Sequence, residues 1–281
     1  MYRIREITFA LKILLSLLAI GAAALFFVIY LGAYDITATD QHTRPVHWAL
    51  DKGMRQAVRL RARHIKPPSL DDPTLTLRGF IHYRDSCQPC HGAPGVAPAP
   101  FAQGMMPLPN NLAQTAIEWS SAELYWVTRN GIKMTGMPAW EFRYPDAELW
   151  QIVAFVKRLP TFTAADYAEL DRKNEQRSVP NWHTVAHQSG DARRGMVAIQ
   201  QYACTACHTI PGIVGAEAHV GPSLLGIGSR RYLAGRLPNT TENMIRWLRQ
   251  PHEVKPGTLM PDLQVADHHA RDIAAYLATL N

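Results

Sequence analysis

The longest apolar stretch of the chain lies near its start, where residues 13–33 contain no charged side chain. A helix needs about 20 apolar residues to cross the hydrocarbon core of a bilayer. A cleaved signal peptide is the alternative, although its apolar region is normally only about 7–15 residues long. The pattern therefore predicts a transmembrane signal anchor over residues 1–33. Because Arg3, Arg5 and Lys12 precede the run, the positive-inside rule places the N-terminus in the cytoplasm and the rest of the chain outside.

Residues 34–73 are predicted to connect this span to the first folded domain. Apolar residues recur at helical spacing between positions 50 and 65, while Arg55, Arg59 and Arg63 share another face. Pro67 and Pro68 end the helix, because proline cannot continue one. Two interpretations stay open. The helix either rests its basic face on anionic lipid or a partner subunit, or it packs on the first domain.

Two similar units follow, over residues 74–160 and 188–281. Each is predicted to begin with a helix, near 74–87 and 190–204, and to end with one, near 146–159 and 267–280. We expect a glycine of each opening helix, Gly79 or Gly195, to lie where an aromatic residue of the closing helix, Phe155 or Tyr276, crosses it. The polar segment 161–187 is interpreted as a linker or interdomain strap. The predicted fold class is mostly α, with a transmembrane helix and two helical domains.

All four cysteines lie in two copies of one motif, C-x-x-C-H, which is the attachment site of c-type haem. Each thiol adds to a vinyl group of the porphyrin, and the histidine binds the iron. A zinc ribbon would space its cysteine pairs about 15–20 residues apart, whereas 114 positions separate them here. A thiol–disulfide motif does not need the histidine. The pattern predicts two covalently attached haem c groups, held by Cys87, Cys90, His91, Cys204, Cys207 and His208.

The charge of the chain is concentrated beside the predicted span. Residues 1–66 hold ten basic and four acidic side chains, which account for the whole net charge of +6. The remaining 19 basic and 19 acidic side chains balance. Nucleic-acid binding needs a basic face on a folded domain, so the composition predicts no nucleic-acid partner.

The sixth iron ligand distinguishes electron transfer from catalysis, because a methionine thioether closes the iron and raises its potential. Met137-Pro138 and Met260-Pro261 both stand in glycine-containing loops before the closing helices, 46 and 52 positions after the motif histidines. Methionine more often fills gaps in cores, but its repeated placement favours both residues as ligands. Met134 competes locally with Met137, and ligation by a second histidine is the other alternative.

The order of opening helix, C-x-x-C-H motif, Met-Pro loop and closing helix resembles class I cytochromes c over roughly 74–160 and 188–281. In that family a proline carbonyl accepts a hydrogen bond from the haem-binding histidine, which implies that Pro222 orients His208. The first unit departs from the family pattern at residues 109–112, which offer no certain counterpart of Pro222. The second unit has one extra residue between Gly195 and Cys204. The resemblance also implies a propionate contact for Arg230, Arg231 and Tyr232.

Within that family the chain is similar to a membrane-anchored dihaem cytochrome c of a respiratory chain. The resemblance implies electron transfer without enzymatic activity, at the outer face of the bacterial inner membrane, with the haem domains in the periplasm. It implies a redox donor and acceptor such as a bc1-type complex, a terminal oxidase or a dehydrogenase, besides membrane lipid. The alternative is a fixed haem subunit of a terminal oxidase, such as the cbb3 type, or of a membrane dehydrogenase. A dihaem cytochrome c peroxidase needs one open iron, which two Met-Pro loops disfavour.

Overall fold

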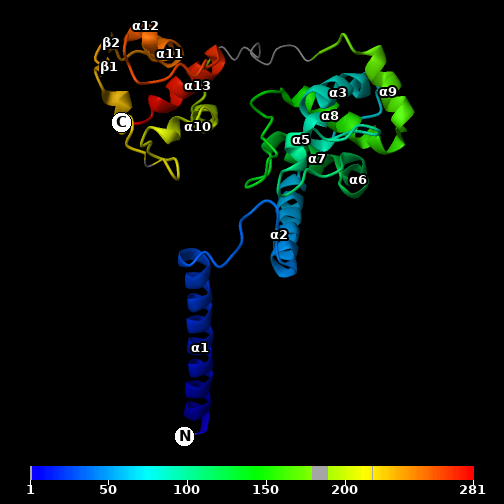
Figure 1. Cartoon of the computed structure of the whole chain (residues 1–281), viewed down its shortest axis with the longest axis vertical. Coiled ribbons are helices and arrows are strands. Elements are labelled where there is room, and N and C mark those ends of the chain that lie inside the picture. Colours follow the sequence, from blue (N-terminus) through cyan, green and yellow to red (C-terminus); the bar gives the residue numbers. More distant parts are fainter. Residues whose placement is uncertain (1, 179–188, 217) are drawn as a thin grey trace.

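The computed structural model describes residues 2–178, 189–216 and 218–281 (Figure 1). The described part is mostly helical and includes a two-stranded antiparallel sheet that pairs Tyr232 with Pro238 and Leu233 with Leu237. Its elements are α1 (Tyr2–Tyr30), α2 (Arg44–Ala62), α3 (Pro73–Ser86), α4 (Gln88–His91), α5 (Pro100–Gln103), α6 (Leu112–Glu118), α7 (Ser121–Asn130), α8 (Asp146–Arg158), η1 (Leu159–Thr161), α9 (Ala164–Lys173), α10 (Ala192–Gln201), η3 (Cys204–Ala206), η4 (Ile227–Ser229), β1 (Tyr232–Leu233), β2 (Leu237–Pro238), α11 (Thr241–Arg249), α12 (Pro251–Val254) and α13 (Asp267–Leu277).

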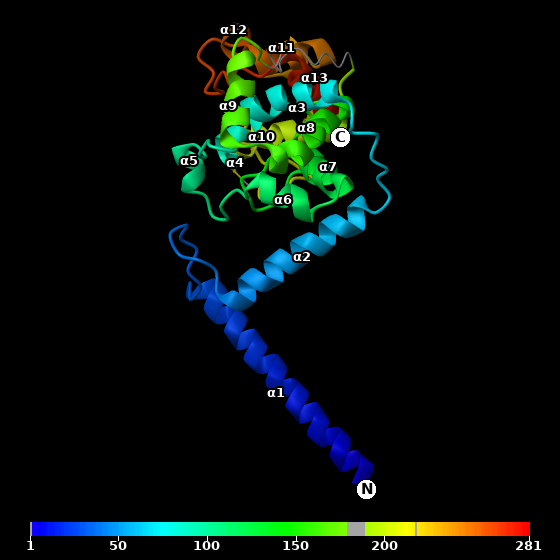
Figure 2. The same cartoon turned by 90° about the vertical axis from the view of Figure 1, so that its right-hand side faces the viewer.

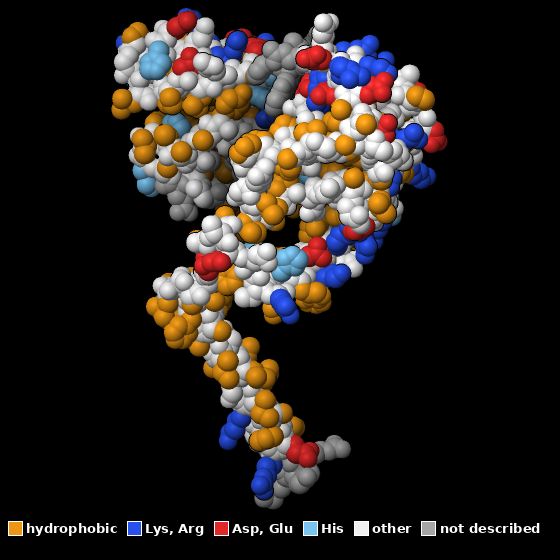
Figure 3. Space-filling view, turned by 45° about the vertical axis from the view of Figure 1, so that its right-hand side comes forward, with side chains coloured by type: hydrophobic (Ala, Val, Ile, Leu, Met, Phe, Trp, Pro, Cys, Tyr) orange, Lys and Arg blue, Asp and Glu red, His pale blue; other side chains and the backbone are white. Residues whose placement is uncertain are grey.

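Helix α1 is a candidate membrane anchor. Its segment from Arg5 to Tyr30 is long and apolar enough to span a bilayer, and none of it is buried in the protein. Hydrophobic side chains cover much of this helix in Figure 3, with basic side chains towards its N-terminal end. The helix ends at Tyr30, slightly before the end of the uncharged run, and Gly32 follows it with a positive φ of 61°. That conformation commonly ends a helix and favours glycine.

Helix α2 packs on the first unit, by which we mean residues 73–173 (Figure 2). Val58 is only 2% exposed and belongs to the core of that unit. The Arg59 Nε lies 3.4 Å from an oxygen of Glu123. The structure therefore supports the second interpretation of the connector, in which the helix packs on the first domain and part of its basic face binds protein carboxylates.

We expect Arg55→Ala to destabilise the first unit by about 1 kcal/mol, since it removes a cation–π contact and a weak ion pair. The Arg55 guanidinium carbon lies 4.3 Å from the centroid of Trp119, and Nη1 lies 3.9 Å from a carboxylate oxygen of Glu118. Denaturant unfolding followed by circular dichroism measures the loss. The control is Lys52→Ala, because Lys52 is an exposed residue of the same helix. Equal midpoints for the two variants would show that the Arg55 contacts contribute nothing.

The opening and closing helices cross in backbone contact in both units, as the glycines predict. A Cβ placed on Gly79 would lie 1.9 Å from the carbonyl oxygen of Gln151 in α8 and 2.9 Å from Cβ of Phe155. A Cβ on Gly195 would lie 2.0 Å from the carbonyl oxygen of Asp272 in α13 and 2.9 Å from Cβ of Tyr276. Neither position has space for a side chain, so glycine is required at both crossings.

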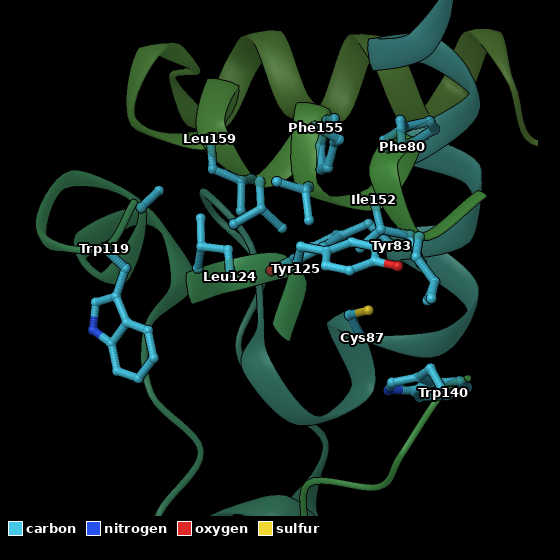
Figure 4. Packing of buried hydrophobic residues seen from close by; sticks show 14 of the residues in the cluster. Phe80, Tyr83, Cys87, Trp119, Leu124, Tyr125, Trp140, Ile152, Phe155 and Leu159 are labelled. Carbon is cyan, nitrogen blue, oxygen red and sulfur yellow. The ribbon is translucent and has the colours of Figure 1, made fainter. Parts of the chain in front are cut away.

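Helix α9 belongs to the packed first unit, although the sequence analysis assigned residues 161–187 to a linker. Tyr167 is fully buried, and its ring centroid lies 5.6 Å from that of Phe80. Phe80 packs in turn against Phe155, beside Tyr83 and Cys87 (Figure 4). A helix that buries mainly one aromatic side chain has no strong apolar period, which explains the difference. Residues 179–188 of the expected linker lie outside the described residues.

The second unit comprises residues 192–277, and its helices α10 and α13 pack face to face around Ile199 and Ile273. A partly buried ion pair reinforces this packing, because both nitrogens Nε and Nη2 of Arg194 lie 2.9 Å from the carboxylate of Asp272. Helix α10 ends at Gln201, and not next to the cysteine motif as predicted.

Candidate functional site

The first C-x-x-C-H motif forms a single helical turn at the end of α3. The backbone N–H groups of Cys90 and His91 both donate to the carbonyl oxygen of Cys87, at 3.1 and 2.9 Å. Burial raises the pKa of the Cys87 thiol to about 12 and also raises the pKa of Cys90. The turn thus presents two protonated thiols beside an imidazole.

The second motif repeats this turn despite its extra residue. The backbone N–H groups of Cys207 and His208 donate to the carbonyl oxygen of Cys204, at 3.2 and 3.0 Å. Ala203, just before the motif, adopts a left-handed conformation with φ of 53°. This conformation ends α10 early and absorbs the added residue, so the spacing difference noted in the sequence leaves the local geometry of the motif unchanged.

A backbone carbonyl orients each motif histidine. Nδ1 of His208 lies 2.7 Å from the carbonyl oxygen of Pro222, the contact that the resemblance implies. Nδ1 of His91 lies 2.7 Å from the carbonyl oxygen of Asn110. Because a carbonyl only accepts, Nδ1 carries the proton and Nε2 keeps its lone pair for a metal. Burial lowers the pKa of His91, which favours the same neutral form.

The sequence pattern did not indicate Asn110, because the resemblance implies a proline at this position. The usable signal was the leucine that follows in each unit, since Asn110 precedes Leu112 by two positions and Pro222 precedes Leu224 by two. A carbonyl is supplied by any residue type, so only the backbone path reveals which one serves.

Gly221 gives the His208 ring its space, and we expect Gly221→Ala to disturb the second site alone. A Cβ there would lie 2.6 Å from Cε1 and 2.8 Å from Nδ1 of His208. The imidazole must then turn away from Pro222 and would donate less to a haem iron, so the potential of a haem held there should rise by up to about 100 mV, within the ~0.8 V range that axial ligands span. A redox titration of the haem-loaded chain would measure the potential of each site, and the site at His91 is the internal control. Two unchanged potentials would contradict the positioning role.

The loops that carry the candidate methionines share a local structure. The backbone N–H of Met137 donates to the Thr135 hydroxyl at 3.1 Å, and that of Met260 donates to the Thr258 hydroxyl at 3.3 Å. Both methionines are half-buried against the cores of their units. Met134 is 93% exposed. The structure therefore favours Met137 over Met134, and the two loops share the sequence signal Thr-x-Met-Pro.

The segment expected to contact a propionate has other contacts in this structure. Nη2 of Arg230 donates to the carbonyl oxygens of Ser223 and Leu225, at 2.6 and 3.2 Å, and so holds the loop that follows Pro222. Arg231 and Tyr232 are exposed, and Tyr232 lies in the small sheet. Their contact with a propionate stays a prediction.

The residues of both sites fit a covalently bound haem c. Each unit offers two thiols and an oriented histidine on one turn, with a half-buried methionine in a separate loop. In the first unit a cavity of about 420 Å³ adjoins His91 and is bordered by Tyr83, Asn111 and Leu159. This volume lies within the range of small-molecule sites.

Comparisons with known proteins agree with this arrangement. Residues 75–156 match the family model of cytochrome c oxidase, cbb3-type, subunit III, and residues 192–281 match the cytochrome c family model. A cytochrome c oxidase subunit 2 of Alkalihalophilus pseudofirmus is 35% identical over 92 residues, which are 32% of this chain and 25% of the relative. One of Bacillus sp. (strain PS3) is 37% identical over 65 residues, 22% of this chain and 18% of the relative. The chain thus spans a quarter or less of these relatives, and no solved structure gives a significant match.

Proposed function

We propose that this protein passes single electrons between respiratory partners at the outer face of a bacterial inner membrane. Two tandem cytochrome c-type domains follow an N-terminal apolar helix, and together they fit a membrane-anchored dihaem cytochrome c. The observation that carries the proposal is the repeated site: an attachment turn, a histidine oriented by a carbonyl and a methionine loop occur in both units.

Bound haem c supplies an iron that accepts and releases one electron. Cys87 and Cys90 would hold the first group and Cys204 and Cys207 the second, and the motif histidines and loop methionines would serve as ligands of each iron. The carbonyls of Asn110 and Pro222 keep the imidazoles in one orientation and increase their basicity. The axial pairs we propose are His91 with Met137 and His208 with Met260.

A fixed place in a terminal oxidase is the second candidate, and two observations favour it. The first unit matches the model of a cbb3-type oxidase subunit III. In addition, α2 packs on the first unit, so the two form one packed structure. Only residues 31–43 separate this structure from α1. Thirteen residues span at most roughly 45 Å when fully extended. Such a tether would keep the first unit close to a membrane partner.

Spectroscopy of the purified chain tests the proposal. We expect two covalent haems per chain, both low-spin, and no binding of carbon monoxide to the reduced protein, because methionine closes both irons. Ready carbon monoxide binding at one haem would contradict the double His/Met assignment and favour the alternative function of a dihaem cytochrome c peroxidase. Purification in mild detergent then separates the two candidates. An oxidase subunit comes with its complex, whereas a carrier comes alone.

A further inference from the structure

Three consecutive residues of the first unit, Glu141–Arg143, contact helix α10 of the second. Nη2 of Arg193 lies 2.8 Å from Oε1 of Glu141, and Nη2 of Arg143 donates to Oε1 of Gln201 at 2.8 Å. The Arg193 guanidinium carbon also lies 5.9 Å from the centroid of the Phe142 ring. The loop thus contacts two residues of α10, Arg193 and Gln201, that lie about two helical turns apart. Two separate contacts fix the orientation of α10 relative to the loop as well as its position.

The first unit holds this loop in place by its own contacts. Within that unit, Oε2 of Glu141 lies 3.1 Å from Nη2 of Arg129, and with the two units in contact the Glu141 side chain is only 6% exposed. The backbone N–H of Glu141 donates to the carbonyl oxygen of Arg129 at 3.0 Å, and that of Arg143 to Trp140 at 2.9 Å. Arg129 therefore orients the Glu141 carboxylate that binds Arg193 of the second unit. Because this carboxylate is already held in place, less side-chain entropy is lost when the two units come into contact.

The contact lies next to the iron-binding segments of both units. Glu141 comes four residues after Met137, and Gln201 comes three residues before Cys204. A surface formed by these segments joins the methionine side of one site to the attachment turn of the other.

We propose that the Glu141–Arg143 loop and the Arg193–Gln201 face of α10 form an internal docking surface that holds the two units in one orientation and thereby sets the rate of electron exchange between their haems. This inference rests on the proposed function. Exchange moves one electron from a reduced to an oxidised site, with no bond made or broken and no proton released.

The docking is weak enough to be reversible. Arg193 is 67% exposed, and exposed ion pairs contribute little and are screened by salt. The covalent connection between the units raises their effective concentration, so that a few polar contacts suffice to keep them docked. High salt should therefore slow the exchange.

The test adds a substoichiometric pulse of a photoreduced flavin to the full chain in detergent and follows the redistribution of electrons between the haems. In Arg143→Gln/Arg193→Gln the rate should fall about tenfold, because charge-assisted hydrogen bonds on both sides of the surface are lost. Hydrogen exchange of residues 140–144 and of α10 should rise in parallel, a readout independent of electron transfer. The matched control is Arg246→Gln, an exposed arginine of α11, which should leave the rate unchanged.

Each outcome decides the matter. Unchanged spectra and potentials, with slower and salt-independent exchange in the double variant, support the docking surface. An unchanged rate in the double variant overturns it. If the double variant loses its haem spectrum, Glu141→Gln keeps the shape of the loop and repeats the test with one charge removed. A parent chain whose haems take up no electrons at all overturns the proposed function, whereas reduction of both haems without exchange between them overturns the docking proposal alone.

Discussion

Met137→Ala is expected to open the sixth position of the first haem iron, and Met260→Ala that of the second. Loss of the thioether removes the ligand that favours ferrous iron, so the potential of the affected haem should fall by on the order of 100 mV, within the ~0.8 V range that axial ligands span. The reduced variant should then bind one carbon monoxide per chain. Absorption spectra with and without carbon monoxide measure the opening, and a redox titration measures the shift.

The matched control for the first unit is Met134→Ala. Met134 precedes Met137 by three residues in the same loop, but its side chain is 93% exposed, so we expect no spectral change. If Met134→Ala opened the iron while Met137→Ala did not, the ligand assignment would be reversed. Low-spin spectra that resist carbon monoxide in both Met134→Ala and Met137→Ala would instead point to a histidine as the sixth ligand of the first haem.

Gly79→Ala and Gly195→Ala should each destabilise one unit by at least about 3 kcal/mol, at the upper end of overpacking effects. The added methyl would lie within 2.0 Å of a backbone carbonyl oxygen of the closing helix, and a backbone cannot turn aside as a side chain can. The helices would have to separate, which opens the core that surrounds the haem. Denaturant midpoints of the two units, each followed by the absorbance of its haem, measure the loss.

Gly53→Ala provides the control for these two variants. Gly53 lies within α2, and a Cβ there would meet no atom within 4 Å. Alanine is the better helix former by roughly 1 kcal/mol, so this variant should be unchanged or slightly more stable. A loss at Gly53 equal to that at Gly79 would mean that helix crossing is not the cause of the destabilisation.

Much of the fold followed from the chain by itself. The matches to two cytochrome c-type models confirm the tandem domains, and the backbone contacts at Gly79 and Gly195 confirm the predicted helix crossings. These features could be predicted from the sequence because each depends on residues at short, fixed spacing or on a pattern that occurs twice. The domain boundaries remain predictions. Helix α9 lies beyond the predicted end of the first domain yet packs on it, because a single buried tyrosine, Tyr167, leaves no periodic signal in the sequence.

Local spacing in the chain encodes two C-x-x-C-H motifs, two Met-Pro loops and an apolar segment long enough to span a membrane. The three-dimensional packing was needed to show which backbone carbonyl meets His91, which of two nearby methionines is half-buried, and that Arg230 binds carbonyl oxygens. It also decided that Glu141 meets Arg193, 52 positions away. One difference, the distance along the chain between the contacting residues, explains both groups of results. Residues within one turn meet whatever the fold, whereas contacts between distant residues depend on how the backbone carries them together.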